Sequence, residues 1–355
     1  MTYAPGPNGT KAELRKSKRQ VCTIIDLNKC IGCQLCVVGC KNLWTKRPGT
    51  EHMRWMNVTT NPGKGYPRDY AKKGGGFRKG KPRPGELTSM TDCGDNFQFN
   101  QKEVFFSGKG SRVHFKPTDF KGRDPSWGYN WDEDIGAGEW PNPYFFYIPR
   151  KCNHCSNPAC LAACPRNAIY KREEDGIVVI DQERCDGHRH CIEACPYSAI
   201  YFNPVSEKSE KCIMCFPRVE KGIAPACDRM CTGRTRAFGY LDDKRGQVYK
   251  LVKKWKVALP LHPDYGTSPN VYYVPPLGAR EFAPDGSVTD KTRVPAEEME
   301  RLFGPKVHYS LRMQREEREK VRKGGKSELI DILISKNWYD RFGDFTKEPL
   351  EQYEA

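Results

Sequence analysis

Fifteen of the seventeen cysteines in this 355-residue chain fall into four short runs. The first run has the spacing C-x2-C-x2-C-x3-C, in which three thiols on a tight loop can ligate one iron–sulfur cluster while the fourth ligates a neighbouring cluster. Four such runs predict four clusters in one polypeptide, and therefore an electron-transfer function. In chain order, the runs are Cys30, Cys33, Cys36 and Cys40; Cys152, Cys155, Cys160 and Cys164; Cys185, Cys191 and Cys195; and Cys212, Cys215, Cys227 and Cys231.

Two other uses of cysteine fit this pattern less well. A disulfide framework is disfavoured because the count is odd and the C-x2-C pairs recur too densely. Paired C-x2-C motifs can form a zinc ribbon, but three cysteines within seven residues crowd a single tetrahedral ion. Iron–sulfur chemistry is therefore the favoured interpretation.

Paired runs in bacterial ferredoxins exchange their fourth cysteine, and this rule predicts the ligand sets. Three sets have four thiolates, which suits [4Fe–4S] clusters, whereas the last set has three. The predicted sets are, first, Cys30, Cys33, Cys36 and Cys231; second, Cys212, Cys215, Cys227 and Cys40; third, Cys152, Cys155, Cys160 and Cys195; and fourth, Cys185, Cys191 and Cys164.

The fourth set lacks a thiolate because His188 stands where a regular run would have cysteine. Either this site holds a [3Fe–4S] cluster or His188 completes a four-iron cluster. Both alternatives tend to raise the reduction potential, because a ligand charge is lost. His154 and His190 lie within ligand loops, where hydrogen bonding or exposure is expected. Of the two remaining cysteines, Cys22 is expected in a strand and Cys93 in a loop.

The composition limits the classes of function. Hydrophobic residues make up 37% of the chain and the mean hydropathy is −0.75, so metal binding is expected to supply part of the folding free energy. The formal charge of +15 falls to about +7 once four clusters with ionised thiolates are counted. This weakens a nucleic-acid interpretation. No apolar run is long enough to span a membrane, and residues 1–20 lack a secretory h-region. The protein is therefore expected in the cytoplasm, or exported folded on a partner.

The elements around the cysteines repeat. A β-branched strand runs into Asp26 and then Cys30, and a similar strand runs into Asp181 and then Cys185. Cys-Pro ends a short helix at Cys164 and again at Cys195, and a strand follows in both places. This is the half-unit of a bacterial ferredoxin. The predicted fold class is α+β, with an inner two-cluster unit at 145–204 enclosed by an outer unit of 20–40 plus 205–245.

Two long segments lie outside these units. Residues 41–144 are expected to form an irregular insert, whose five tryptophans either cap clusters of their own chain or form a docking surface. Residues 246–355 are expected to form a helical and extended extension. Within it, residues 246–255, 295–303, 312–323 and 327–334 are predicted helices. The extended stretch 259–277 suits a tail laid over another subunit or over its own surface.

Nearly the whole chain resembles the β subunits of the respiratory nitrate reductase group, which belong to molybdopterin enzymes of the dimethyl sulfoxide reductase family. The order of the runs, the unequal fourth run and the non-cysteine at position 188 carry this resemblance. Residues 26–33, 136–139 and 255–263 are closer to the type II relatives, which include perchlorate, chlorate and selenate reductases, dimethyl sulfide dehydrogenase and ethylbenzene dehydrogenase. The resemblance favours [3Fe–4S] over ligation by His188.

The resemblance implies a non-catalytic subunit with three [4Fe–4S] clusters and one [3Fe–4S] cluster, which conducts electrons between a molybdopterin α subunit and a haem b γ subunit. The first cluster would face α, and the three-iron cluster would face the haem. An ethylbenzene dehydrogenase-like hydrocarbon hydroxylase is the specific expectation, and a perchlorate, chlorate, selenate or nitrate reductase is the alternative. Co-export with a twin-arginine partner would place the complex in the periplasm. A free-standing polyferredoxin is the competing function, and the long insert argues against it because a shuttle needs a small contact surface.

Overall fold

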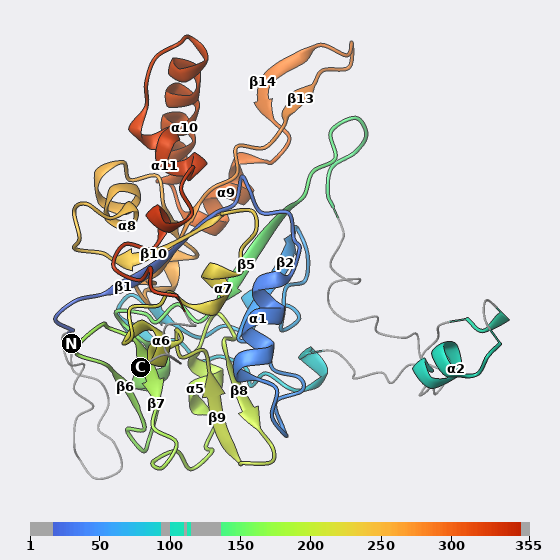
Figure 1. Cartoon of the computed structure of the whole chain (residues 1–355), viewed down its shortest axis with the longest axis vertical. Coiled ribbons are helices and arrows are strands. Elements are labelled where there is room, and N and C mark those ends of the chain that lie inside the picture. The colour runs from blue at the N-terminus through green and yellow to red at the C-terminus, as the bar shows by residue number, and fades with distance from the viewer. Residues whose placement is uncertain (1–16, 94–99, 110–111, 115–135, 349–355) are drawn as a thin grey trace.

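The computed structural model describes residues 17–93, 100–109, 112–114 and 136–348 (Figure 1). Its fold is mixed α and β, as the sequence predicts. A four-stranded sheet lies in the middle of the molecule, the C-terminal helices lie at one end and the ribbons β6–β9 lie at the other. None of the described helices is long and apolar enough to cross a membrane.

The central sheet has the strand order β10-β1-β12-β11. β1 (Val21–Asp26) pairs antiparallel with β10 (Arg236–Tyr240) and parallel with β12 (Val271–Val274), and β11 (Leu259–Pro260) completes the sheet. Because successive side chains of a strand point to opposite faces, β1 contributes to two cores. Val21 and Ile25 pack with Tyr273 and Phe303 on one face, whereas Cys22 and Ile24 pack on the other with residues such as Leu329. The sheet is therefore covered on both faces.

Most of the cysteines lie in loops that connect two-stranded ribbons and short helices. The ribbons pair β2 (Met56–Asn61) with β5 (Phe146–Lys151), β3 (Phe77–Arg78) with β4 (Lys81–Pro82), β6 (Ile169–Lys171) with β7 (Val178–Ile180), and β8 (Ile200–Asn203) with β9 (Lys208–Lys211). The helices are α1 (Leu35–Trp44), α4 (Ala159–Ala162), α5 (His190–Ala194), α6 (Phe216–Val219) and α7 (Ala226–Arg229). The predicted order of strand, ligand loop, short helix and strand is present around Cys164 and Cys195.

The predicted C-terminal helices are confirmed with shifted bounds. They are α8 (Gln247–Tyr249), which continues into the π-helical turn η4 (Lys250–Lys254), α9 (Ala296–Phe303), α10 (Val307–Arg322) and α11 (Glu328–Ile334). α10 begins five residues before the predicted start because Val307 and Ser310 are buried. The Ser327 hydroxyl accepts a hydrogen bond from the Ile330 N–H at 3.2 Å and so caps α11. The remaining elements are the hairpin β13 (Arg280–Phe282) with β14 (Val288–Thr292), α2 (Gln101–Phe106) and the turns η1 (Tyr70–Lys72), η2 (Thr91–Cys93), η5 (Pro263–Tyr265) and η6 (Tyr339–Arg341).

Two expectations need correction. The segment 41–144 is less irregular than predicted, since its strand β2 pairs with β5 along six residues. The stretch 259–277 is not a tail, because it supplies β11 and β12 to the chain's own central sheet. Its hydrophobic residues Val271, Tyr273 and Val274 are at most 1% exposed. A strand that enters a sheet beside a partner some 250 residues away leaves no local sequence signal.

Candidate iron–sulfur centres

The first predicted ligand set lines a single cavity. Cys30, Cys33 and Cys36 lie on the loop and helix that follow β1, and Cys231 joins them from the end of α7. The tight loop depends on Gly32, which has φ +68°. A Cβ at this position would lie 2.7 Å from the ring of Tyr147. Glycine therefore allows the loop to turn close against β5.

The third predicted set also lines a single cavity. Cys152 and Cys155 follow β5, Cys160 lies in α4, and Cys195 is the residue that ends α5. Apolar residues such as Ala159 and Ile200 complete the wall of this cavity. Cys195 of the third run thus shares a cavity with three cysteines of the second run, which is the grouping that the predicted exchange requires.

Three cysteines and two histidines line the cavity of the fourth set. These are Cys164, Cys185, Cys191, His188 and His190. His188 is exposed, and its ring stacks on that of His190 with the centroids 6.3 Å apart. The structure thus brings the three predicted cysteines together, with His188 in the lining of the same cavity.

The second predicted set gathers around Cys40, which α1 brings to the fourth run. Burial raises the pKa of the Cys40 thiol well above its usual value, and Cys212, Cys227 and Cys215 raise it further, so all three are neighbours. The Trp44 indole donates a hydrogen bond to Cys215 Sγ at 3.1 Å. All four predicted sets are therefore brought together by the fold.

The environment of the thiols fits iron–sulfur clusters. Backbone N–H groups donate to the sulfur atoms of Cys212, Cys164 and Cys231 at 3.3, 3.3 and 3.4 Å, and such donors stabilise thiolates. In addition, buried N–H donors beside the sites have no hydrogen-bond partner among the described residues, namely Arg236 Nε and Nη2 and Trp55 Nε1. Buried donors without an acceptor are costly, and the sulfur atoms of a cluster would supply acceptors. Among the described residues, no three Cys, His, Asp or Glu side chains are grouped to hold one metal ion.

The four sites follow one another in a row. Arg236 lines the first cavity. Burial lowers its pKa, but Cys36 of the first set and Cys227 of the second outweigh this and raise it. Burial raises the pKa of Cys212 in the second set to about 12, to which Cys152 of the third set contributes. Burial likewise raises the pKa of Cys191 in the fourth set to about 12, to which Cys195 of the third contributes. Neighbouring sets are thus first and second, second and third, and third and fourth.

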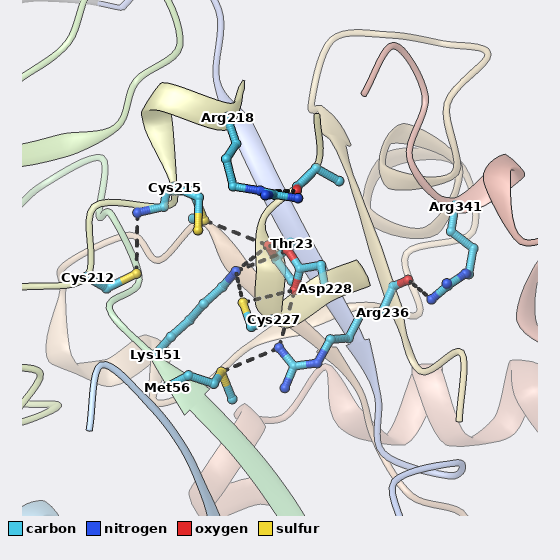
Figure 2. A network of polar contacts seen from close by, with 12 residues as sticks. Thr23, Met56, Lys151, Cys212, Cys215, Arg218, Cys227, Asp228, Arg236 and Arg341 are labelled. Atoms are coloured by element: carbon cyan, nitrogen blue, oxygen red, sulfur yellow. Dashed lines mark hydrogen bonds and ion pairs between the residues drawn. The ribbon is translucent and has the colours of Figure 1, made fainter. Parts of the chain in front are cut away.

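A network of buried charges beside these sites was missed from the sequence. It consists of Lys151, Asp228 and Arg236, with Thr23 as a neutral member (Figure 2). Lys151 directly precedes the predicted ligand Cys152, and Asp228 directly follows the predicted ligand Cys227. That adjacency is the available sequence signal, although it does not reveal that the two residues meet.

His154 was expected to form hydrogen bonds or be exposed, and it is fully buried. Its Nδ1 accepts a hydrogen bond from the Val178 N–H at 3.0 Å, which assigns the ring hydrogen to Nε2. Burial lowers the pKa of His154 well below its usual value, so the ring is neutral. His190 is exposed, with its Nδ1 3.7 Å from Glu193.

The remaining predictions concern cysteines and tryptophans away from the ligand sets. Cys22 lies in β1 as predicted, whereas Cys93 lies in the turn η2, and both are buried. Of the tryptophans in the insert, Trp44 and Trp55 pack beside the cysteine sites of their own chain, while Trp140 is 89% exposed. The packing of Trp44 and Trp55 favours capping over docking for these two side chains, whereas Trp140 is exposed. Trp127 and Trp131 lie outside the described residues.

Comparison with known proteins agrees with this geometry. A family model described as a 4Fe-4S dicluster domain matches residues 143–241. The chain is 56% identical to chlorate reductase subunit beta of Ideonella dechloratans over 92% of its length and 99% of that protein's. It is 54% identical to selenate reductase subunit beta of Thauera selenatis with the same coverage.

A third relative, dimethylsulfide dehydrogenase subunit beta of Rhodovulum sulfidophilum, is 52% identical over 89% of this chain and 96% of its own length. Relatives of this kind are electron-transfer subunits of molybdoenzyme complexes and are not themselves catalytic. They assemble with a molybdopterin catalytic subunit. The chain therefore belongs to the family of iron–sulfur β subunits of the type II dimethyl sulfoxide reductase family of molybdoenzymes.

Proposed function

We propose that the four cysteine sets hold three [4Fe–4S] clusters and one [3Fe–4S] cluster, and that this row conducts electrons between a molybdopterin subunit and a haem b subunit. The observation that carries the proposal is the grouping of the thiols into four neighbouring sets. Each cluster supplies one-electron chemistry. The chain's own residues hold the thiolates, exclude water and order the sites.

We further propose that two ferredoxin units are nested, with 145–204 enclosed by 20–40 plus 205–245. The pairing of β1 with β10 supports this arrangement, because it joins the two halves of the outer unit across more than 200 residues. The grouping of Cys40 with the fourth run and of Cys231 with the first supports it as well. The intervening inner unit then supplies the third and fourth sites.

The two ends of the row have different surfaces, which supports different partners. Around the first site, the apolar side chains of Ile31, Val38 and Met230 are 69, 49 and 42% exposed, which suits a protein interface. At the fourth site, His188 and Arg189 are exposed and polar. We assign the molybdopterin subunit to the first end and the haem b subunit to the fourth.

The reaction of the whole complex is proposed to be ethylbenzene dehydrogenase-like hydroxylation of a hydrocarbon, with a selenate, chlorate, perchlorate or nitrate reductase as the alternative. The named relatives belong to reductases and to a dehydrogenase, so both directions of electron flow occur at similar identity. The proposed location is the periplasm, reached by co-export with the catalytic subunit, and the cytoplasm is the alternative.

Elemental analysis of the complex, purified anaerobically from separate periplasmic and cytoplasmic fractions, tests the proposal. We expect about 15 iron atoms per chain from these ligands, with co-purifying molybdenum and further iron from the partners. The same preparation is assayed with ethylbenzene, chlorate and selenate to identify the reaction. Iron without molybdenum or a partner would instead indicate a free-standing polyferredoxin, and zinc in place of iron would exclude both.

Substitution of His188 tests the three-iron assignment. We expect His188→Ala to keep the three-iron signal in electron paramagnetic resonance, because the three thiolates of the fourth set are unchanged. His188→Cys restores a fourth thiolate, so we expect about one more iron atom per chain and loss of the three-iron signal. If His188→Ala instead changes the cluster type, then His188 is itself a ligand.

A further inference from the structure

The buried space between the first and second sites is bridged by three charged side chains in contact. Asp228 lies between the two cations, with its Oδ1 3.3 Å from Arg236 Nη1 and its Oδ2 3.2 Å from Lys151 Nζ (Figure 2). Thr23 Oγ1 donates to Asp228 at 3.0 Å and lies 2.8 Å from Lys151 Nζ. We call Arg236, Asp228 and Lys151 the charged bridge.

The charged bridge carries one uncompensated positive charge. Each of its side chains is at most 1% exposed. The two oxygens of the Asp228 carboxylate each contact a cation, at 3.2 Å from Lys151 Nζ and 3.3 Å from Arg236 Nη1, and Thr23 donates a further hydrogen bond, an environment that suits an ionised carboxylate. Two cations and one anion leave a net charge of +1. A buried, unbalanced charge is unfavourable unless another charge of opposite sign lies nearby.

The ends of the bridge point to where the balancing charge lies. Lys151 Nζ is 3.7 Å from Cys227 Sγ of the second set. At the other end, Arg236 lines the first cavity, and its Nε and Nη2 have no hydrogen-bond partner among the described residues. Two of the three guanidinium nitrogens thus lack an acceptor in the wall of a space surrounded by thiols. Acceptors carrying negative charge within the first and second sites would satisfy both observations.

We propose that the charged bridge raises the reduction potentials of the clusters at the first and second sites, with Arg236 acting on the first and Lys151 on the second. This inference rests on the proposed occupancy of those sites. When one electron arrives, the negative charge at a site increases by one, and a nearby buried cation stabilises the reduced form more than the oxidised form. Asp228 holds the two cations in place and limits the size of the effect. These are positioning and tuning residues, since no bond is made or broken.

Redox titration of the intact complex, followed by electron paramagnetic resonance, tests the proposal. We expect Arg236→Met to lower the reduced-to-oxidised ratio of the first cluster at a fixed potential at least tenfold, which is a shift of about 59 mV for one electron. Arg236→Lys keeps the charge and loses the forked donors, so a smaller shift in the same direction is expected. Lys151→Met is expected to lower the potential of the second cluster more than that of the first.

Asp228→Asn is expected to shift the reduction potentials in the opposite direction. It removes the anion and keeps both cations, so the potentials of both clusters are expected to rise. Arg150→Met is the control, because Arg150 is a buried arginine whose charge lowers the pKa of Cys195 in the third site. It is expected to leave the first and second clusters unchanged.

Iron content separates the possible outcomes. If Arg236→Met binds as much iron as the unmodified chain and its potentials are unchanged, the proposal is wrong. Shifts of the same direction in Arg236→Met, Arg236→Lys and Asp228→Asn would indicate a purely structural role and would also overturn it. If Arg236→Met does not assemble, Arg236→Lys and Asp228→Asn still decide the question. An unmodified chain without iron would contradict the proposed function itself, which is a separate result.

Discussion

A Cys40→Ala chain is expected to lose the cluster of the second site and keep that of the first, although Cys40 belongs to the first run of cysteines. The reason is that α1 presents Cys40 to Cys212, Cys215 and Cys227, whereas Cys36, one helical turn earlier, lines the first cavity. The expected loss is about four iron atoms per chain. Iron analysis and electron paramagnetic resonance of the purified complex measure it.

The matched variant is Cys36→Ala on the same helix, which is expected to affect the first cluster instead. Cys22→Ala is the control for a buried cysteine outside every predicted ligand set, and it should bind the full complement of iron. If Cys36→Ala and Cys40→Ala disturb the same cluster, the fourth cysteine is not exchanged and each run serves its own site.

Loss of the second cluster is also expected to stop electron transfer through the chain. The second site lies between the first and third. Cys36 of the first set and Cys227 of the second both raise the pKa of Arg236, and Cys152 of the third set raises the pKa of Cys212 of the second. A chemical reductant that bypasses the chain should still reduce the catalytic subunit of a Cys40→Ala complex. Electron transfer from the far end of the row to molybdenum should fall to background. Transfer at the normal rate would show that the sites do not form a single row.

The second large effect is expected from Phe303→Ala, which should lower the free energy of unfolding by about 3–5 kcal/mol. Phe303 ends α9, is 1% exposed and packs beside Tyr273 of β12, with the ring centroids 6.2 Å apart. Removal of this ring leaves a cavity against the central sheet. Chemical denaturation followed by circular dichroism measures the change as a lower midpoint.

Val288→Ala in the β13–β14 hairpin is the control for this substitution. Val288 is 56% exposed, so the change in stability is expected to stay within about 0.5 kcal/mol. A midpoint for Phe303→Ala equal to that of Val288→Ala would show that the C-terminal residues do not stabilise the sheet. The structure predicts instead that the C-terminal helices and the central sheet unfold together.

The cysteine sites were predictable because their signal is local. In the first three runs, two to five residues separate successive cysteines, and in the fourth run the widest gap is the eleven residues between Cys215 and Cys227. A strand such as β1 ends a few residues before the run. The exchange of Cys40 and Cys231 follows from a general property of paired ferredoxin runs and needs no knowledge of the remaining chain. The α9 and α11 helices were also predictable, since Pro295, Gly304 and Ser327 mark their ends.

Other features depend on contacts between distant segments. β12 is a core strand because it pairs in parallel with β1, with Val271 opposite Thr23. β2 was hidden in a segment of irregular composition because its partner β5 begins 85 residues after it ends, and a strand is stabilised largely by its neighbours.

The sequence alone therefore predicted which residues bind iron, since thiol type and spacing are local properties. The tertiary structure decided the order of the sites and the charges between them. Lys151, Asp228 and Arg236 come from β5, α7 and β10, and each is an ordinary charged residue when read singly. They act as a unit because the fold removes all three from water. In that low-dielectric space, each charge must be balanced by its neighbours.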